Sequence, residues 1–265
     1  MLTATAESTE APCRHVLAAH ASSASFVAFR VAFGVLAAAG QFRFVARGWV
    51  EEFLLAPDVH LTYAGFGWVR PLPTSAMYVI VLGLGVLGLL IAAGVATRPA
   101  AALFAVGFAY VELMEAALYL NHYWFMTLAA VVLAVVPGPA DGRVSLLSVW
   151  ALRTQLAVVY VFAGIAKVNR DWLLRGEPLT TWFAARTDRP VIGALLDAPI
   201  VGLAASWAGA LFDLTIVGWL LWRRSRPVAY AALVVFHVAT AMLFQIGLFP
   251  WIMIALTPIF FASDW

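Results

Sequence analysis

Long apolar runs separated by short polar stretches dominate the chain. A helix needs about 20 mainly apolar residues to cross a bilayer, so each run is a candidate membrane span. The pattern predicts eight helical spans, at residues 24–45, 75–96, 99–119, 122–137, 150–168, 199–222, 227–245 and 247–262.

Two of these divisions follow from length. As a single helix, residues 99–136 would be roughly 57 Å long, against a bilayer core of about 30 Å. We expect this run to break at Asn121–His122, its most polar point. Residues 228–262 must break for the same reason, and Gly247 and Pro250 provide a turn and a helix start.

Two connecting stretches, residues 46–73 and 169–198, mix tryptophan and other large apolar side chains with charged ones. This mixture is typical of segments that lie in the membrane interface, where aromatic rings meet lipid headgroups. The alternative is a pair of ordinary packed loops.

Composition supports a membrane protein. Hydrophobic residues make up 64% of the 265 residues and charged ones 11%, whereas soluble domains have about 45–50% and about 25%. We predict an all-α, polytopic transmembrane helix bundle of about eight spans, with interfacial helical segments and no large soluble domain. Residues 1–22 would form a polar tail and residues 23–265 the membrane domain. The net charge of +2 is too small to indicate a nucleic-acid partner.

The N-terminal stretch has acidic residues, no basic region typical of a signal peptide, and the chain's single cysteine, Cys13. We therefore expect no intramolecular disulfide, and we expect the first span to act as its own insertion signal. The Arg-Arg-Ser-Arg loop at 223–226 favours a cytoplasmic location for that loop and for the N-terminus. The predicted location is a multi-pass position in a membrane, the cell membrane if the source is bacterial.

Gly83, Gly85 and Gly88 match the G-x-G-x-x-G pattern of dinucleotide sites. That site requires a strand before the glycines and a helix that opens at them. These three glycines lie within one apolar run, where small residues let helices approach closely. The pattern therefore indicates helix packing.

Polar residues within spans are costly and usually face the bundle interior. Glu112 and Glu115 would share one helical face. Arg30 is interpreted as a snorkelling cation or the partner of an acid, Asp213 as that acid or a helix–helix acceptor, and His237 as a core histidine. No spacing typical of metal ligands or of an activated nucleophile occurs. The full set is Arg30, Glu112, Glu115, Asn121, His122, Lys167, Asp213 and His237.

Lys167 is the only lysine among 16 basic residues. A buried amine favours its neutral form, which accepts a proton, whereas arginine stays protonated and is a poor base. The alternative is a snorkelling interfacial cation. His122 begins one predicted span and Lys167 ends the next, so alternation of spans places both near the same membrane surface.

Four segments resemble, in order, the membrane domain of the vitamin K-dependent gamma-glutamyl carboxylases and their bacterial relatives, the HTTM (horizontally transferred transmembrane) family. They are RPLPTSAMY at 70–78, LNHYWFMTL at 120–128, VYVFAGIAKVNRDWLLRGEPL at 159–179, and the closing block at 236–265. The resemblance covers residues 24–265.

The resemblance implies an enzyme in which a lysine base deprotonates reduced vitamin K or menaquinol. In that family, O2 converts the quinol to an epoxide through a strongly basic alkoxide. The alkoxide removes a gamma proton from a glutamyl residue, and the carbanion captures CO2. Carried over, the catalytic residues are Lys167 and His122, and the pocket residues are Asn121, His237, Asp213, Glu115, Arg30 and Trp172.

The chain also departs from the carboxylase pattern. Ala166 stands where the carboxylases commonly have a second lysine, and the chain given ends at Trp265, before their large soluble region. We expect partners to include membrane lipid, a quinol, and a glutamyl peptide or a protein that supplies that region. The alternative function is a non-catalytic partner or maturation factor for a secreted peptide. A transporter is disfavoured because the chain shows no repeated halves.

Overall fold

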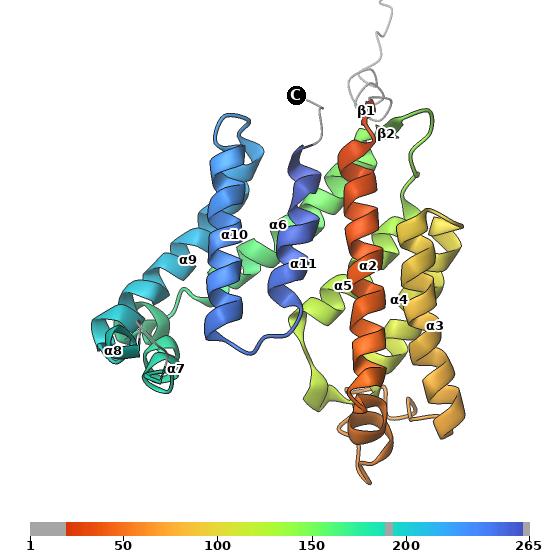
Figure 1. Cartoon of the computed structure of the whole chain (residues 1–265), viewed down its shortest axis with the longest axis horizontal. Coiled ribbons are helices and arrows are strands. Elements are labelled where there is room, and N and C mark those ends of the chain that lie inside the picture. The colour runs from red at the N-terminus through yellow and green to blue at the C-terminus, as the bar shows by residue number, and fades with distance from the viewer. Residues whose placement is uncertain (1–19, 189–192, 262–265) are drawn as a thin grey trace, which may run out of the picture. The chain divides into compact units, whose positions relative to one another are not determined.

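The structure is a computed structural model that describes residues 20–188 and 193–261. Helices dominate these residues (Figure 1), and the predicted all-α membrane bundle is confirmed. The chain divides into two compact units, Met1–Arg153 with Phe261–Trp265 (unit 1) and Thr154–Phe260 (unit 2). Cys13 and residues 1–19 of the predicted tail lie outside the described residues.

The elements follow the chain in a simple order. Those of unit 1 are β1 (His20–Ser22), α2 (Ala24–Ala46), η1 (Val50–Leu55), α3 (Thr74–Ala93), α4 (Thr97–Met114), η2 (Ala116–Leu118), α5 (Asn121–Val135) and β2 (Arg143–Ser145). The helix α6 (Leu146–Ala166) runs from unit 1 into unit 2. Then come η3 (Asp171–Arg175), α7 (Leu179–Ala184), α8 (Gly193–Leu196), α9 (Pro199–Leu221), α10 (Arg226–Leu243), α11 (Phe249–Leu256) and η4 (Thr257–Phe261).

Each of the eight predicted spans contains a helix. Five helices, α2, α3, α6, α9 and α10, are long and apolar enough to cross a membrane, as expected for a multi-pass membrane protein. The helix α5 and the pair α11–η4 are apolar but shorter. The predicted interfacial stretches contain short helical pieces, η1 in the first and η3, α7 and α8 in the second. Their position in the membrane interface stays a prediction.

The predicted span 99–119 is wrong at its C-terminal end. The helix α4 ends at Met114, and Glu115 is extended, with φ −142° and ψ 101°. The Glu115 carboxylate accepts hydrogen bonds from the backbone N–H groups of Leu61 and Ala117, at 3.3 and 3.0 Å. These bonds replace those that a continued helix would make. Glu112 and Glu115 therefore do not share a helical face, and the break precedes Asn121.

Small residues bring α2 and α3 into close contact in unit 1. A Cβ atom added to Gly88 would lie 2.8 Å from both Ala38 N and Gly34 O, and one added to Gly85 would meet the Phe42 ring at 2.6 Å. A Cβ on Gly83 would meet nothing within 4 Å. The helix-packing interpretation of the glycine pattern is confirmed for Gly85 and Gly88.

A tight hairpin turn precedes β2. Asp141 and Gly142 have φ values of +50° and +71°, and Ala140 and Arg143 exchange two backbone hydrogen bonds of 2.8 and 2.9 Å. Asp-Gly is a favoured pair for such two-residue turns because both positions need positive φ. The Ser23 N–H donates to Gly142 O at 3.0 Å, so the turn also fixes the start of α2.

In unit 2, α9 is the element on which the others pack: η3, α7, α8 and α10 all contact it. Glycines again allow close approach. A Cβ on Gly164 of α6 would lie 2.8 Å from the Leu214 side chain, and one on Gly202 would lie 2.5 Å from Thr180 Oγ1. These contacts place α6 and α7 against α9 and define the walls of the cavity described below.

Arginine side chains donate hydrogen bonds to backbone carbonyl groups at the C-terminal ends of three helices. Arg30 donates to Ile91 O near the end of α3 at 2.7 Å, and Arg98 donates to Ala134 O near the end of α5 at 2.9 Å. Arg226 donates to Leu220 O at the end of α9 at 2.8 Å. The last carbonyl groups of a helix have no partner within it, and a cation there also complements the helix dipole.

The glycine contacts lead to a prediction with an internal control. Gly88→Ala should lower the free energy of unfolding by about 1–3 kcal/mol, because its new methyl group would overlap the α2 backbone. Gly83→Ala, on the same helix with open space around it, should leave stability unchanged or slightly higher. Thermal unfolding of both variants in lipid nanodiscs measures the difference, and equal behaviour of the two would contradict close α2–α3 packing.

Candidate functional site

A cavity of about 380 Å³ lies within unit 2. Its walls come from α6, η3, α7, α9, α10 and the segment that joins α10 to α11, and most of the side chains are apolar or aromatic. The polar side chains are few. They are Tyr160, Lys167, Asp213, His237 and Thr240.

Lys167 follows the last residue of α6, and its amine makes two hydrogen bonds and one ring contact. Nζ lies 2.6 Å from Asp213 Oδ2 and 3.1 Å from Ala163 O, to which it donates. It also lies 5.2 Å from the centre of the Trp172 ring, as in a cation–π contact. The side chains of Lys167 and Asp213 are 20% and 6% exposed, so the pair is largely shielded from solvent.

Local sequence explains how this pair forms. Tyr160, Ala163 and Lys167 are spaced by three and four residues, which places them on one face of α6. The close approach at Gly164 brings Asp213 of α9 to that face. Trp172 is fixed by two bonds, since its indole N–H donates to Ser206 O at 2.6 Å and its backbone N–H donates to Asn169 Oδ1 at 2.9 Å.

His237 is the second polar group of the cavity. It is 1% exposed, and its Nε2 lies 3.0 Å from the Tyr160 hydroxyl. Its other ring nitrogen, Nδ1, is buried without a hydrogen-bond partner among the described residues. When the Tyr160 O–H donates to Nε2, the proton of the neutral ring sits on Nδ1, which is then a free donor.

A cluster of aromatic side chains forms part of the cavity wall. Phe244, just after α10, stacks on Phe183 of α7 with ring centres 6.0 Å apart and meets Trp182 edge-on at 5.5 Å. All three residues line the cavity. Such a wall favours a ligand with an apolar, flat body.

The remaining predicted site residues belong to unit 1. His122 is buried with its ring centre 4.7 Å from that of Tyr123, and Asn121 Oδ1 accepts a bond from Tyr119. Glu115 is occupied by Leu61 N–H, Ala117 N–H and His60, whose Nδ1 lies 3.2 Å from Oε2. A shared site for His122 and Lys167 stays a prediction.

Two charged residues of the predicted site each have a partner within their own unit. Arg30 donates to Ile91 O near the end of α3 in unit 1. Asp213 pairs with Lys167 in unit 2.

Several residues of these polar networks were not among the site residues predicted from the sequence. Tyr160 could have been found from its spacing to Lys167 on one face of α6. Arg153 is a charged residue in an apolar run and is 1% exposed, the same signal that identified the others. His60 and Thr127 carry no such signal, because their partners lie 55 and 15 residues away along the chain.

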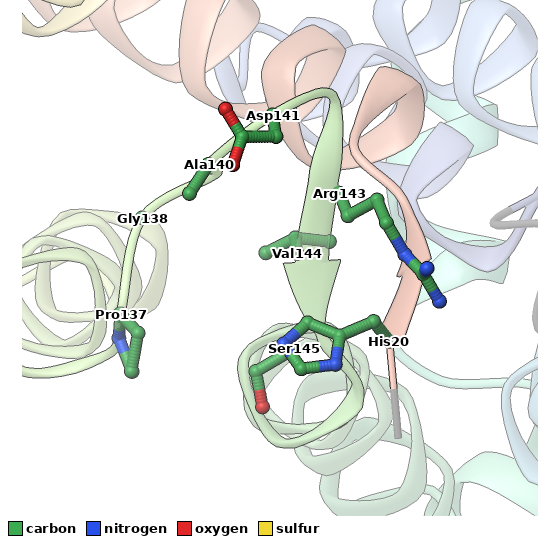
Figure 2. Close-up of a pocket in the computed structure, with 8 residues that line it drawn as sticks. All are labelled: His20, Pro137, Gly138, Ala140, Asp141, Arg143, Val144 and Ser145. Carbon is green, nitrogen blue, oxygen red and sulfur yellow. The ribbon is translucent and has the colours of Figure 1, made fainter. Parts of the chain in front are cut away.

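A second cavity, also of about 380 Å³, lies in unit 1 between residues 137–140 and β2 (Figure 2). His20, Asp141 and Arg143 are its charged or titratable lining residues. In Figure 2 the Asp141 carboxylate and the Arg143 guanidinium point to opposite sides of the strand. Polar groups that diverge in this way do not form a binding constellation, whereas those of the unit 2 cavity converge.

The unit 2 cavity therefore combines an apolar, aromatic-lined space with one ion pair able to move a proton and one histidine able to donate a hydrogen bond. This arrangement suits acid–base chemistry on an apolar molecule that carries oxygen atoms. Comparison with known families matches residues 19–265 to the HTTM domain. No solved structure matches the chain.

The ion pair should be a structural requirement as well as a chemical one. Asp213→Asn leaves a shielded ammonium without its counter-ion, and we expect it to lower the free energy of unfolding by about 3 kcal/mol. Adding Lys167→Met to Asp213→Asn should restore most of that loss, because the unpaired charge is then gone. Thermal unfolding of the two single variants and the double variant tests this, and additive losses would contradict the pairing.

Proposed function

Because the chain belongs to the HTTM family, whose domain is linked to the membrane domains of vitamin K-dependent carboxylases, we propose that it is a membrane enzyme that deprotonates a quinol in the unit 2 cavity. The observation that carries this proposal is the Lys167–Asp213 pair at 2.6 Å inside an apolar, aromatic-lined cavity. The proposed quinol is reduced vitamin K or menaquinol, with O2 as co-substrate.

The cavity residues fit a quinol. The ring would lie against the aromatic side chains of Trp172, Phe183 and Phe244, and the ring oxygens would meet the few polar groups. Lys167 and His237 would hold the two oxygens, since one carries the amine and the other a buried nitrogen without a partner. When bound, the quinol supplies the oxidisable ring that reacts with O2.

The ion pair has capacity for one further proton. In the resting pair, the Lys167 ammonium faces the Asp213 carboxylate. Lys167 passes one of its protons to Asp213 Oδ2, which frees a lone pair on Nζ, and a ligand hydroxyl then gives its proton to Nζ. The hydroxyl loses one proton, Asp213 gains one, and the ammonium remains beside the new oxyanion to stabilise it.

This scheme explains why the residue is lysine. Where the structure needs only a cation, at the ends of α3, α5 and α9, the chain uses arginine. A guanidinium does not release its proton in proteins, so arginine at position 167 would bind Asp213 but would not pass a proton to it. Lysine combines the ion pair with proton transfer.

His237 would orient the second ring oxygen. With Nε2 held by Tyr160, Nδ1–H is the donor available to a ligand oxygen in a buried, mainly apolar region. Tyr160 thus acts through His237 as a positioning residue.

Carboxylation of a glutamyl residue, with CO2 as co-substrate, is the further step that we propose on the resemblance to the carboxylases. His122 and Asn121 are the residues proposed for it, as a catalytic residue and its neighbour. The acceptor would be a glutamyl peptide, or a protein that supplies the soluble region of the carboxylases.

Quinone epoxidation tests the proposal directly. Protein in lipid nanodiscs is given reduced vitamin K or menaquinol under air, and the epoxide is followed by mass spectrometry. Lys167→Ala and Lys167→Arg should each lose at least about 100-fold in rate, the low end of the contribution of a general base. Arg175→Ala is the matched control, because Arg175 is 74% exposed in a surface pair with Asp171 and does not line the cavity.

Two outcomes would contradict the proposal. Full activity in Lys167→Arg would exclude lysine as the base. No epoxide from folded wild-type protein with several quinols would favour the alternative, a non-catalytic partner or maturation factor for a secreted peptide.

Filling the cavity should block the ligand without touching a polar group. Ala208 lines the cavity and Ala204, one turn earlier on α9, does not, although both are exposed. Ala208→Phe should weaken quinol binding by about tenfold or more, equivalent to about 1.4 kcal/mol, while Ala204→Phe should bind as the wild type does. Quenching of tryptophan fluorescence by a quinone measures both affinities, and equal affinities would place the ligand elsewhere.

A further inference from the structure

Glu112 is an acid that the proposed reaction does not use. It lies near the end of α4, and 9% of its surface is exposed. One carboxyl oxygen, Oε2, accepts a hydrogen bond of 2.5 Å from the Thr127 hydroxyl of α5. The other oxygen, Oε1, is buried and has no partner among the described residues.

The ionised form of Glu112 would be energetically unfavourable in this buried position. Burial of an ionised carboxylate costs far more than burial of a neutral polar group unless the charge is paired and hydrogen-bonded. Glu112 makes no ion pair with any described residue and has a single hydrogen bond. A proton on Oε1 removes the charge, and Oε2 can still accept the bond from Thr127.

No described residue around Glu112 forms an ion pair that would neutralise its carboxylate in place of a proton. Tyr123 of α5 lies near both Glu112 and Arg43 of α2. Arg43 makes no ion pair with Glu112 among the described residues, and its guanidinium is 5.0 Å from the centre of the Trp49 ring. The helix α3, which also packs on α4, has no charged side chain. The nearby acid Glu115 is itself held by His60 and two backbone N–H groups.

We propose that Glu112 is a proton-binding site inside unit 1, held as a carboxylic acid in the resting protein and able to release or take up one proton at Oε1. The site is independent of the cavity of unit 2 and of the function proposed for it. Thr127 fixes the carboxyl rotamer, so that the exchangeable proton is presented by one oxygen. Glu112 is then an internal proton donor and acceptor between α4 and α5.

Glu115 provides a matched contrast three residues away. Both acids are buried, but the Glu115 carboxylate accepts two backbone N–H bonds and faces His60, whereas Glu112 accepts one bond from a hydroxyl. The two sites differ in their partners and not in their depth. We therefore expect Glu112 to be protonated at neutral pH.

Infrared spectroscopy of the full chain in lipid nanodiscs tests the proposal. The wild type should show a carbonyl-stretching band of a protonated carboxylic acid at neutral pH, with a shift in D2O. Glu112→Gln should remove this band and Glu115→Gln should keep it. The band should also decrease as the pH is raised, because the site releases its proton.

A second variant keeps the test decisive if Glu112→Gln fails to fold. Thr127→Val removes the donor to Oε2 but keeps the shape of the side chain, so the same band should move to higher frequency. The proposal is overturned if folded wild-type protein lacks the band at neutral pH. It is also overturned if Glu115→Gln removes the band, or if Thr127→Val leaves its frequency unchanged.

Discussion

A polar group inside a bilayer has no water to bond, and the fold of this chain depends on how its few polar groups find partners within the protein. Arginines from α2, α4 and α10 reach the terminal carbonyl groups of α3, α5 and α9. Each bond also ties one helix to the end of another. With the close approach at Gly34 and Gly88, they fix helices whose apolar faces alone would pack with little specificity.

The same constraint gives the Lys167–Asp213 pair its chemical character. In water, an exposed pair of this kind contributes little and exchanges protons freely with solvent. Inside an apolar cavity, the two groups are largely shielded from that exchange. Trp172 and Ala163 O complete the surroundings of the amine, so its protonated form is satisfied before any ligand enters. The pair is thus held in place by contacts from three elements of unit 2.

Much of the fold could be predicted from the sequence, because apolar length and helix-breaking residues depend on local composition. The eight helical segments and the role of Gly85 and Gly88 follow from it. The end of α4 could not be predicted, since it depends on Leu61 donating to Glu115 from 54 residues away. In the site, Lys167, Asp213, Trp172 and His237 are recognisable as unusual residues for their surroundings, whereas their pairing is set by how α6, α9 and α10 pack. Partners such as Thr127 and His60 are ordinary residues until the packing of their helices and loops is known.

Groups left without partners are as informative as those that have them, since buried polar atoms are nearly always hydrogen-bonded. Among the described side chains, the buried atoms without a partner are three hydroxyls, Arg43 Nε, Glu112 Oε1 and His237 Nδ1. Arginine keeps its proton, so Glu112 and His237 are the two groups of this set that can give up or take a proton near neutral pH. Each is held on its other side by a hydroxyl, Thr127 for Glu112 and Tyr160 for His237. A structure that fixes one atom of a titratable group and leaves the other free presents that free atom in a defined direction. This is the arrangement expected of a group that binds a ligand or carries a proton, and each unit of the chain contains one.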